Sequence, residues 1–383
     1  MTDEPLLDAP TALLRADRQG LLRPVAAAGA QVRTAARAAG ETLAPLRPQG
    51  RPATVLVAGP GPDVPLAAAV LAALGDGAVR VVQLTATGPA ADPGLLRWQL
   101  PRWAGPLDVV VLTSADGSES GLVELLDQAH RRGCALASVA PGGSPLAEAT
   151  ARRRMPALRA TTAEHLEPAD HPAAPGGHWP LLTATLMLGD RLGVCEADGA
   201  ALDALADRLD ATAERCGPVV PTRDNPAKTL AVGCEGALPL LWSEGDLATA
   251  VADHAARLLH ALPGVPALAA PLPRALTEHA ALLTARRSGG DPDDFFRDRA
   301  EDEPELHPRV ILLDSPAPAD VPPGADLPPR AAAAARDLAR RHGVAFGELT
   351  AAEGGHPLET TGELLAQLDF TAVYLTLTAT ARS

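Results

Sequence analysis

Residues 108–140 carry the clearest pattern of hydrophobic and polar positions in the chain. Residues 108–113 are a short apolar run rich in β-branched side chains, and residues 114–120 are mostly polar. Apolar side chains then recur three and four positions apart, at Leu122, Leu125, Leu126 and Ala129. Gly133 ends this predicted helix, and a second apolar run follows at 134–140. The segment therefore predicts a βαβ unit, which crosses over right-handed into a parallel sheet.

The loop of this unit is rich in hydroxyl groups. Thr113, Ser114, Ser118 and Ser120 lie in or beside it, at the carboxyl end of the first predicted strand. Ligands of open α/β sheets bind at that edge. Free backbone N–H groups and the dipole of the following helix favour an anion there. The loop is the first candidate binding site.

The same strand and helix rhythm continues along the chain. Further strands are expected at 53–59, 79–84, 238–242, 265–270, 309–313 and 344–349. Further helices are expected at 10–45, 66–74, 178–196, 199–216, 246–262, 273–285, 330–342 and 356–378. Asn225 followed by Pro226 predicts a helix start, because Asn caps a helix and Pro fits its first turn.

These elements predict an α/β protein with two copies of one architecture. Each copy is expected to be a parallel sheet flanked by helices, in a three-layer arrangement of the flavodoxin or Rossmann type. The segment 216–231 is the candidate boundary between the copies. The expected units are an N-terminal helical segment (1–48), a first α/β domain (49–217) and a second α/β domain (218–383).

Composition narrows the classes of partner. The 383 residues are 46% hydrophobic but only 2% aromatic, so the cores must be built from Ala, Val and Leu. Lys228 is the one lysine among 33 basic residues, which we attribute to the coding bias of a high-GC genome. The net charge of −14 disfavours nucleic acid and anionic membrane surfaces as partners. No secretory or membrane-spanning segment is recognised, which predicts a cytoplasmic protein.

Several motifs suggest other chemistry only weakly. Gly59-Pro60-Gly61 follows a strand like half of a dinucleotide fingerprint, but Val64 stands where the third glycine belongs. His165 and His171 have no identifiable partner ligands, and the acidic stretch 289–305 lacks the spacing of a calcium loop. The cysteines are far apart and are expected to be small buried hydrophobes: Cys134, Cys195, Cys216 and Cys234. No metal and no cofactor are therefore expected.

Four segments in order resemble a known family. They are VAGPG (57–61), TSADGSESGLVELLDQAHRRG (113–133), DNPAKTLA (224–231) with the following LPLLW, and APLPRALTEHAALL (270–283). The chain resembles proteins with two sugar-isomerase (SIS) domains, and is most similar to the bifunctional phosphoglucose/phosphomannose isomerase family, as a divergent member of actinobacterial type. The resemblance covers roughly residues 50–375.

The resemblance implies a fold, a ligand and roles for individual residues. It implies two tandem SIS domains, a homodimer, a ligand cleft between the domains and a hexose phosphate as substrate, without a cofactor. The glycine turn at Gly59 and Gly61 and the loop residues Thr113, Ser114 and Ser118 would bind the sugar phosphate. His279 would open the sugar ring. Glu278, or alternatively Glu244, would serve as the base that moves a proton between C2 and C1.

The chain also departs from the family pattern, which leaves a second interpretation open. Asp116 stands where the phosphate loop should carry a second serine, and its carboxylate would repel phosphate. Pro60 and Pro62 remove two N–H donors from the glycine turn. Residues 252–264 contain no glutamate, and the C-terminal lysine of the family is missing. The alternative to an aldose–ketose isomerase is therefore a non-catalytic SIS protein that binds or regulates.

Overall fold

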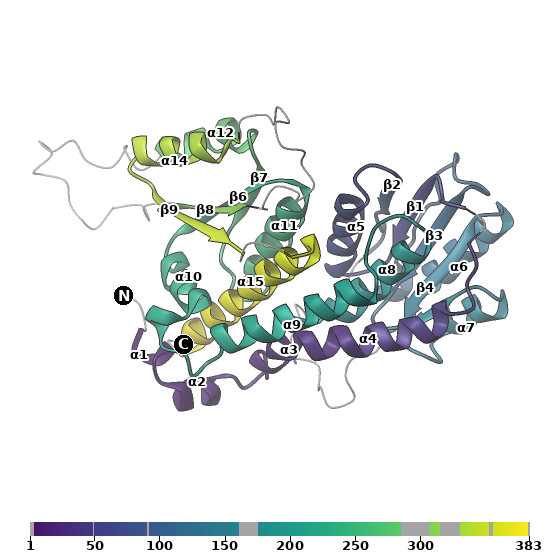
Figure 1. The fold of residues 1–383 in the computed structure, drawn as a ribbon, viewed down its shortest axis with the longest axis horizontal. Helices are drawn as coiled ribbons and strands as arrows, with labels where there is room; N and C mark the ends of the chain where they lie inside the picture. The colour runs from purple at the N-terminus through teal and green to yellow at the C-terminus, as the bar shows by residue number, and fades with distance from the viewer. Residues whose placement is uncertain are drawn as a thin grey trace, which may run out of the picture.

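The computed structural model describes residues 4–48, 50–89, 92–160, 175–284, 307–314, 330–351 and 355–381 (Figure 1). Two parallel β-sheets, each with helices on both faces, lie side by side in it. Among the described residues, no helix combines the length and apolarity that a membrane span requires.

The first sheet has five strands in the order β2-β1-β3-β4-β5, all parallel. They are β1 (Thr54–Ala58), β2 (Arg80–Leu84), β3 (Asp108–Thr113), β4 (Ala135–Ala140) and β5 (Ala157–Arg159). The central strands β1 and β3 are buried along their whole length, which explains their continuous apolar runs. Their register pairs Val57 with Val111.

The second sheet repeats this order with one strand fewer, as β7-β6-β8-β9, again all parallel. Its strands are β6 (Leu238–Glu244), β7 (Leu268–Pro271), β8 (Pro308–Asp314) and β9 (Ala345–Thr350). In both sheets the second strand in sequence lies outside the first, and the third strand lies on the other side. The expected fold class of two similar parallel α/β units is confirmed.

Helices cover both faces of each sheet. The first half contains α5 (Asp63–Leu74), η1 (Pro93–Leu95), α6 (Ser120–Arg131), α7 (Pro145–Arg152), α8 (Trp179–Arg191) and α9 (Gly199–Cys216). The second half contains η2 (Thr222–Asp224), α10 (Pro226–Cys234), α11 (Asp246–Ala261), α12 (Ala275–Glu278), α13 (Ala280–Thr284), α14 (Ala332–Arg341) and α15 (Pro357–Thr380). Before the first sheet come α1 (Glu4–Leu7), α2 (Pro10–Ala16), α3 (Leu22–Ala26) and α4 (Ala28–Leu43).

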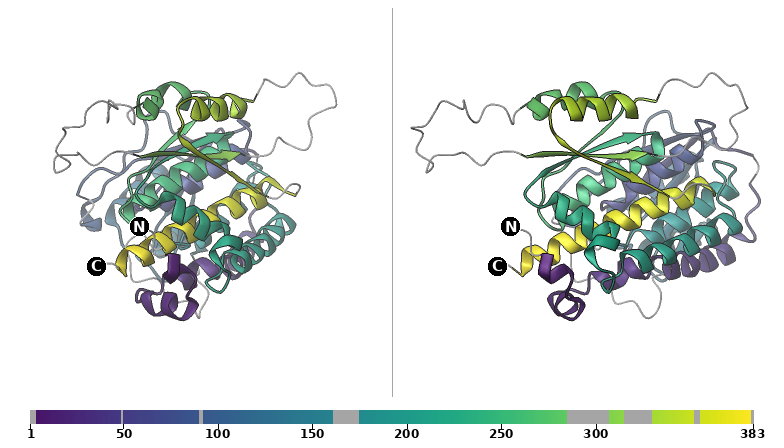
Figure 2. Two further views of the ribbon diagram at one scale, coloured as in Figure 1. Left: turned by 90° about the vertical axis from the view of Figure 1, so that its left-hand side faces the viewer. Right: turned by 60° about the vertical axis from the view of Figure 1, so that its left-hand side comes forward.

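One hydrophobic core joins the two halves. It contains Val57 and Val111 from the first sheet and Leu241 and Ile311 from the second. The outer face of each sheet has a separate core, under α6 in the first half and under α12 and α14 in the second. Helix α11 packs against α5, and α15 packs against α9, α10 and α11, so helices from the two halves interlock between the sheets. Figure 2 shows α14 and α15 on opposite faces of the second sheet.

Of three helix predictions, one is confirmed and two are wrong. The helix start at Asn225 is confirmed, because its side chain accepts a hydrogen bond from the Lys228 N–H at 3.0 Å and Pro226 occupies the first turn. The single helix expected at 273–285 is wrong, since it is divided into α12 and α13 at His279. The backbone leaves helical geometry there, and the His279 side chain is buried against Trp242. The helix expected at 10–45 is likewise divided into α2, α3 and α4.

Candidate functional site

The hydroxyl-rich loop lies where the strand order of the first sheet reverses, between the carboxyl ends of β1 and β3. Gly59 follows β1, and a Cβ placed on it would lie 2.2 Å from the Thr113 carbonyl oxygen at the end of β3. Only glycine therefore fits at position 59. Gly61 adopts a φ of +89°, which side chains disfavour. The structure thus brings the predicted glycine turn and the predicted phosphate loop together, at the usual ligand position of such sheets.

The donors of this loop are used by groups of the loop itself. The Ser114 hydroxyl donates to Glu119 Oε2 at 2.7 Å, and both side chains are buried. Ser114 Oγ accepts hydrogen bonds from the Gly117 N–H at 2.7 Å and the Asp116 N–H at 3.2 Å. The Ser118 N–H donates to Asp116 Oδ1 at 2.7 Å. The carboxylates of Glu119 and Asp116 therefore already accept hydrogen bonds from a hydroxyl and an N–H group of the loop.

Thr113 faces inward rather than toward a ligand. Its side chain is fully buried, and its hydroxyl donates to the Ala58 carbonyl at 3.3 Å. Gly117 completes the loop with a φ of +70°, and a side chain there would collide with the Ser144 hydroxyl. The loop is therefore tightly packed against the start of α7, which limits how far it can change shape.

The predicted catalytic pair lies in a different place. His279 and Glu278 lie beside α12, on the outer face of the second sheet, and no hydrogen bond or ion pair between described residues joins them to the loop. Trp242 Nε1 donates to His279 Nδ1 at 2.9 Å, and burial lowers the pKa of His279. Glu278 is half exposed and pairs with Arg274 at 3.2 Å. The roles assigned to His279, Glu278 and the loop residues thus stay predictions.

The alternative base Glu244 ends β6, at the corresponding reversal point of the second sheet. Its Oε1 accepts a hydrogen bond from the Ala331 N–H at 2.7 Å, and its Oε2 lies 3.3 Å from Arg330 Nε. Arg330 also pairs with Asp314 at the end of β8. This edge of the second sheet is therefore closed by an arginine held between two carboxylates, and the Glu244 carboxylate already has cationic and N–H partners.

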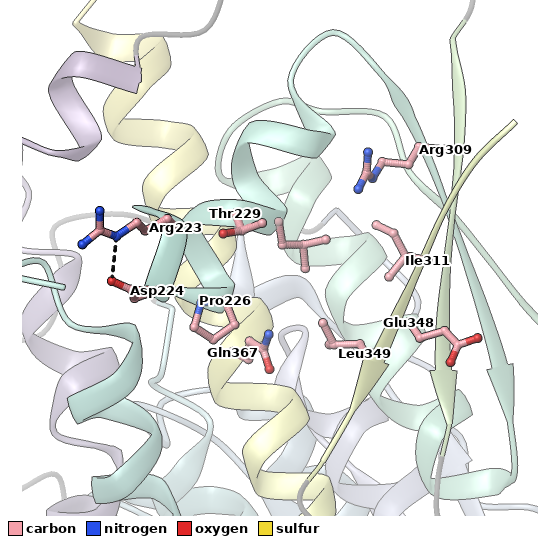
Figure 3. A pocket seen from close by; sticks show the side chains of 11 residues that line it. Arg223, Asp224, Pro226, Thr229, Arg309, Ile311, Glu348, Leu349 and Gln367 are labelled. Atoms are coloured by element: carbon pink, nitrogen blue, oxygen red, sulfur yellow. Dashed lines mark hydrogen bonds and ion pairs between the residues drawn. The ribbon is translucent and has the colours of Figure 1, made fainter. Parts of the chain in front are cut away.

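A pocket of about 380 Å³ opens between α10, α15 and strands β8 and β9 (Figure 3). Ile311, Leu230 and Leu349 form its apolar part. Arg309 extends along its wall, with the guanidinium packed over Gly233, where a Cβ would lie 2.6 Å from the guanidinium carbon. The rest of the lining is Thr229, Gln367, the ion-paired Arg223 and Asp224, Pro226, Gly347 and Glu348. The pocket therefore combines an apolar wall with guanidinium and carboxylate groups.

A group of three buried residues was missed by the sequence analysis. His178, His254 and Asp369 place one potential ligand atom each within 4.8 Å of one another, between the two halves. His178 begins α8, His254 is in α11 and Asp369 is in α15. The signal available in the sequence was a lone aspartate within the apolar helix 357–380, but the partners are too distant along the chain to be recognised.

The cysteines behave as expected from the sequence. All four are buried and free, and burial raises the pKa of Cys195 to about 12 and those of Cys216 and Cys234 to about 11. They are therefore neutral thiols at physiological pH. His165, His171 and the acidic stretch 289–305 lie outside the described residues.

The fold is that of an α/β protein with two parallel sheets, and several solved structures share it. Structures of similar fold include a hypothetical protein from Thermus thermophilus, with a TM-score of 0.61 and 16% identity over 97% of this chain and 89% of that chain. A "putative phosphosugar isomerase" from Clostridium difficile 630 has a TM-score of 0.60 and 11% identity, over 95% of this chain and 93% of that chain. A "putative phosphosugar isomerase" from Silicibacter pomeroyi DSS-3 has a TM-score of 0.58 and 18% identity, over 94% of this chain and 97% of that chain.

The family is identified more closely in the second half of the chain. Residues 223–380 match the family model of the bacterial phospho-glucose isomerase C-terminal SIS domain. No curated protein sequence matches the chain. The predicted resemblance to SIS proteins of the phosphoglucose isomerase type is therefore confirmed. All residues that line the pocket beside Arg309 fall within the matched region.

Proposed function

We propose that this protein binds a hexose 6-phosphate or a related anionic sugar. The observation that carries the proposal is the match of residues 223–380 to the phosphoglucose isomerase SIS domain, in a chain whose fold places two glycine-containing turns at a ligand edge. The natural position for the phosphate is the loop 113–120, beside Gly59 and Gly61. The homodimer expected from the resemblance and the cytoplasmic location expected from the sequence belong to this proposal.

Isomerisation of glucose, mannose and fructose 6-phosphates is the first candidate activity. It requires His279 to open the ring and Glu278 or Glu244 to carry the proton between C2 and C1. These residues lie away from the loop of the same chain, so a second subunit would have to complete the site. Purified protein assayed for interconversion of the three sugar phosphates should then show turnover that His279→Ala abolishes.

Binding without turnover is the second candidate, and the geometry of the loop favours it. Glu119 accepts the Ser114 hydroxyl, Asp116 accepts the Ser118 N–H, and Trp242 donates to the ring of His279. Each hydrogen bond uses a group that catalysis would need. This candidate predicts that calorimetry detects sugar phosphate while the isomerase assay remains at the background rate. If calorimetry detects neither glucose, mannose nor fructose 6-phosphate, the binding proposal itself is wrong.

The contact between Ser114 and Glu119 offers a direct test of the binding position. Glu119→Gln removes a negative charge beside the loop, and we expect the Kd for glucose 6-phosphate to fall about tenfold, because like charges at this range oppose binding by more than about 1 kcal/mol. Glu124→Gln is the matched control, since Glu124 lies on the same helix but is exposed and pairs with Arg97. An equal effect of the two substitutions would place the phosphate elsewhere.

A further inference from the structure

Three side chains from three helices meet in the interior between the two sheets. His178 precedes the first turn of α8, His254 lies in the middle of α11 and Asp369 lies in the middle of α15. Their exposed fractions are 2%, 6% and 0%. Polar groups at this depth are costly unless they are fully paired. A buried trio with two imidazoles and one carboxylate therefore requires a physical reason.

Each imidazole of the trio has one nitrogen close to a different oxygen of Asp369. His254 Nε2 lies 3.2 Å from Asp369 Oδ1, and His178 Nδ1 lies 3.9 Å from Asp369 Oδ2. The two imidazole rings are 4.9 Å apart between centroids, in an edge-to-face arrangement. Tetrahedral ligands about 2.0–2.2 Å from zinc are separated from one another by about 3.4 Å. The three potential ligand atoms lie within 4.8 Å of one another, so they would have to move closer together around a central ion.

The hydrogen bonds within the protein leave the trio incomplete. The contact between His254 and Asp369 is the only hydrogen bond found within the trio. Among the described residues, His178 Nε2, His254 Nδ1 and Asp369 Oδ2 are buried without a hydrogen-bond partner. Most buried polar atoms in proteins do have a partner. The unpaired Asp369 Oδ2 is the oxygen that lies toward His178 Nδ1, so it indicates a missing ligand there, whereas His178 Nε2 and His254 Nδ1 are the ring nitrogens that do not contact Asp369.

The charged groups in and near the trio are the carboxylates of Asp369 and Asp63 and the guanidinium of Arg257, and burial raises the pKa of Asp63. Asp369 is fully buried, and Asp63 at the start of α5 lies within electrostatic range of both Asp369 and His254. Arg257, one turn along α11 from His254, is the cation that interacts with Asp63, and its Nε has no hydrogen-bond partner among the described residues.

We propose that His178, His254 and Asp369 bind a divalent transition-metal ion, with zinc preferred. Two imidazoles and one carboxylate are a ligand set that zinc and its neighbours favour, whereas calcium and magnesium prefer oxygen ligands alone. The ion joins α8 of the first half to α11 and α15 of the second. It also lies near Asp63, which follows the glycine turn at 59–62. The site is independent of the proposed sugar binding.

Metal binding is tested on the full chain without a histidine tag. The protein is stripped with a chelator and titrated with Co²⁺, followed by visible absorption, and with Zn²⁺ in competition. We expect one ion per chain. His254→Gln should weaken binding at least about 100-fold, because loss of outer-shell groups alone commonly costs about 10–100-fold. His260→Gln is the matched control, since His260 is exposed on the same helix and should leave binding unchanged.

Two further measurements cover the case in which His254→Gln fails to fold. X-ray absorption of the zinc-loaded wild type should show two imidazole ligands and at least one oxygen ligand. Zn²⁺ should raise the melting temperature of the wild type and of His260→Gln alike. The proposal is overturned if the wild type binds neither ion stoichiometrically, if His254→Gln binds as tightly as the wild type, or if the absorption spectrum shows fewer than two imidazoles.

Discussion

Lys228 and Asp369 are both fully buried charged residues between the halves of this protein, yet their surroundings differ. The Lys228 ammonium donates to three carbonyl oxygens, those of Leu7, Pro218 and Val220, at 2.7–2.8 Å. Asp369 receives one hydrogen bond, from His254, and its second oxygen has none among the described residues. An ammonium has three protons, so the Lys228 site is complete and the Asp369 site is not.

This difference separates a structural polar centre from a candidate binding centre. The partners of Lys228 lie in α1 and in the segment before α10, and the Tyr374 ring of α15 lies 5.5 Å from the ammonium. Lys228 therefore contacts α1, the segment before α10 and α15, and all of its partners belong to the chain itself. The trio around Asp369 requires something that the chain itself does not supply. Substitutions at the two centres should consequently respond differently to added metal.

The largest effect is expected for Lys228→Met. The substitution leaves three buried carbonyl oxygens without their donor, and each orphaned group costs about 1–3 kcal/mol. We expect the free energy of unfolding, measured by urea denaturation, to fall by about 3 kcal/mol or more, with or without Zn²⁺. The exposed Arg131→Met is the control and should change it by less than about 0.5 kcal/mol. A loss below about 1 kcal/mol would show that the lysine is not a structural centre.

Asp369→Asn should change the free energy of unfolding by less than Lys228→Met does, and the sign of the change should depend on whether Zn²⁺ is present. In chelator, the variant should be as stable as the wild type or more stable, because it removes a poorly compensated buried charge. With Zn²⁺ at about 100 times its Kd, the wild type should gain about 2.7 kcal/mol and the variant should gain little. Urea denaturation in chelator and in Zn²⁺ measures the free energy of unfolding of both proteins and shows whether their order changes. Equal responses of both proteins to Zn²⁺ would mean that Asp369 is no ligand.

The two centres also differ in how far the sequence could reveal them. Lys228 stood out as the only lysine, directly after the Asn225-Pro226 helix start, and that start was predicted correctly because capping is a local property of neighbouring residues. The strands and the reversal-point loop were recognisable for the same reason, since apolar periodicity is local. His178, His254 and Asp369 meet only after α8, α11 and α15 pack, and no local pattern encodes that packing.

The loop 113–120 was located from the sequence, but its internal hydrogen bonds were not. Asp116 was recognised as a departure, while Glu119 was overlooked because a glutamate before a helix usually faces solvent. In the structure its side chain turns inward to accept the Ser114 hydroxyl. The break in the helix at His279 was missed as well, because the buried partner Trp242 comes from a distant strand. A hydrogen bond within the loop decided the first case, and a contact with a distant strand decided the second.

A moderate effect is expected for Tyr374→Phe, which tests the edge of the Lys228 centre. The substitution keeps the ring beside the ammonium but removes the hydroxyl that donates to the Cys216 carbonyl at 2.5 Å. We expect the free energy of unfolding to fall by about 1 kcal/mol. Thr376→Val on the same helix is the control, because its hydroxyl bonds only to the Ala372 carbonyl one turn away. A loss as large as that of Lys228→Met would mean that the hydroxyl orders the whole centre.

The smallest effect concerns Asp8, which ties the N-terminal segment to the boundary segment on the exposed side of the Lys228 centre. Its Oδ1 accepts hydrogen bonds from the Thr222 N–H at 2.7 Å and hydroxyl at 2.8 Å, and these lower the pKa of Asp8 below 3.8. The unfolded chain therefore binds this proton more readily, so the stabilisation is complete above about pH 3.8 and is lost as the pH falls through the folded pKa. Because the carboxylate is exposed, the free energy of unfolding of the wild type should exceed that of Asp8→Asn by less than about 1 kcal/mol at about pH 7. This difference should disappear as the pH falls through the folded pKa of Asp8. In the Thr222→Val background, Asp8→Asn should lower the free energy of unfolding by less at neutral pH. A difference between the wild type and Asp8→Asn that stays constant with pH would exclude the charged hydrogen bonds as its cause.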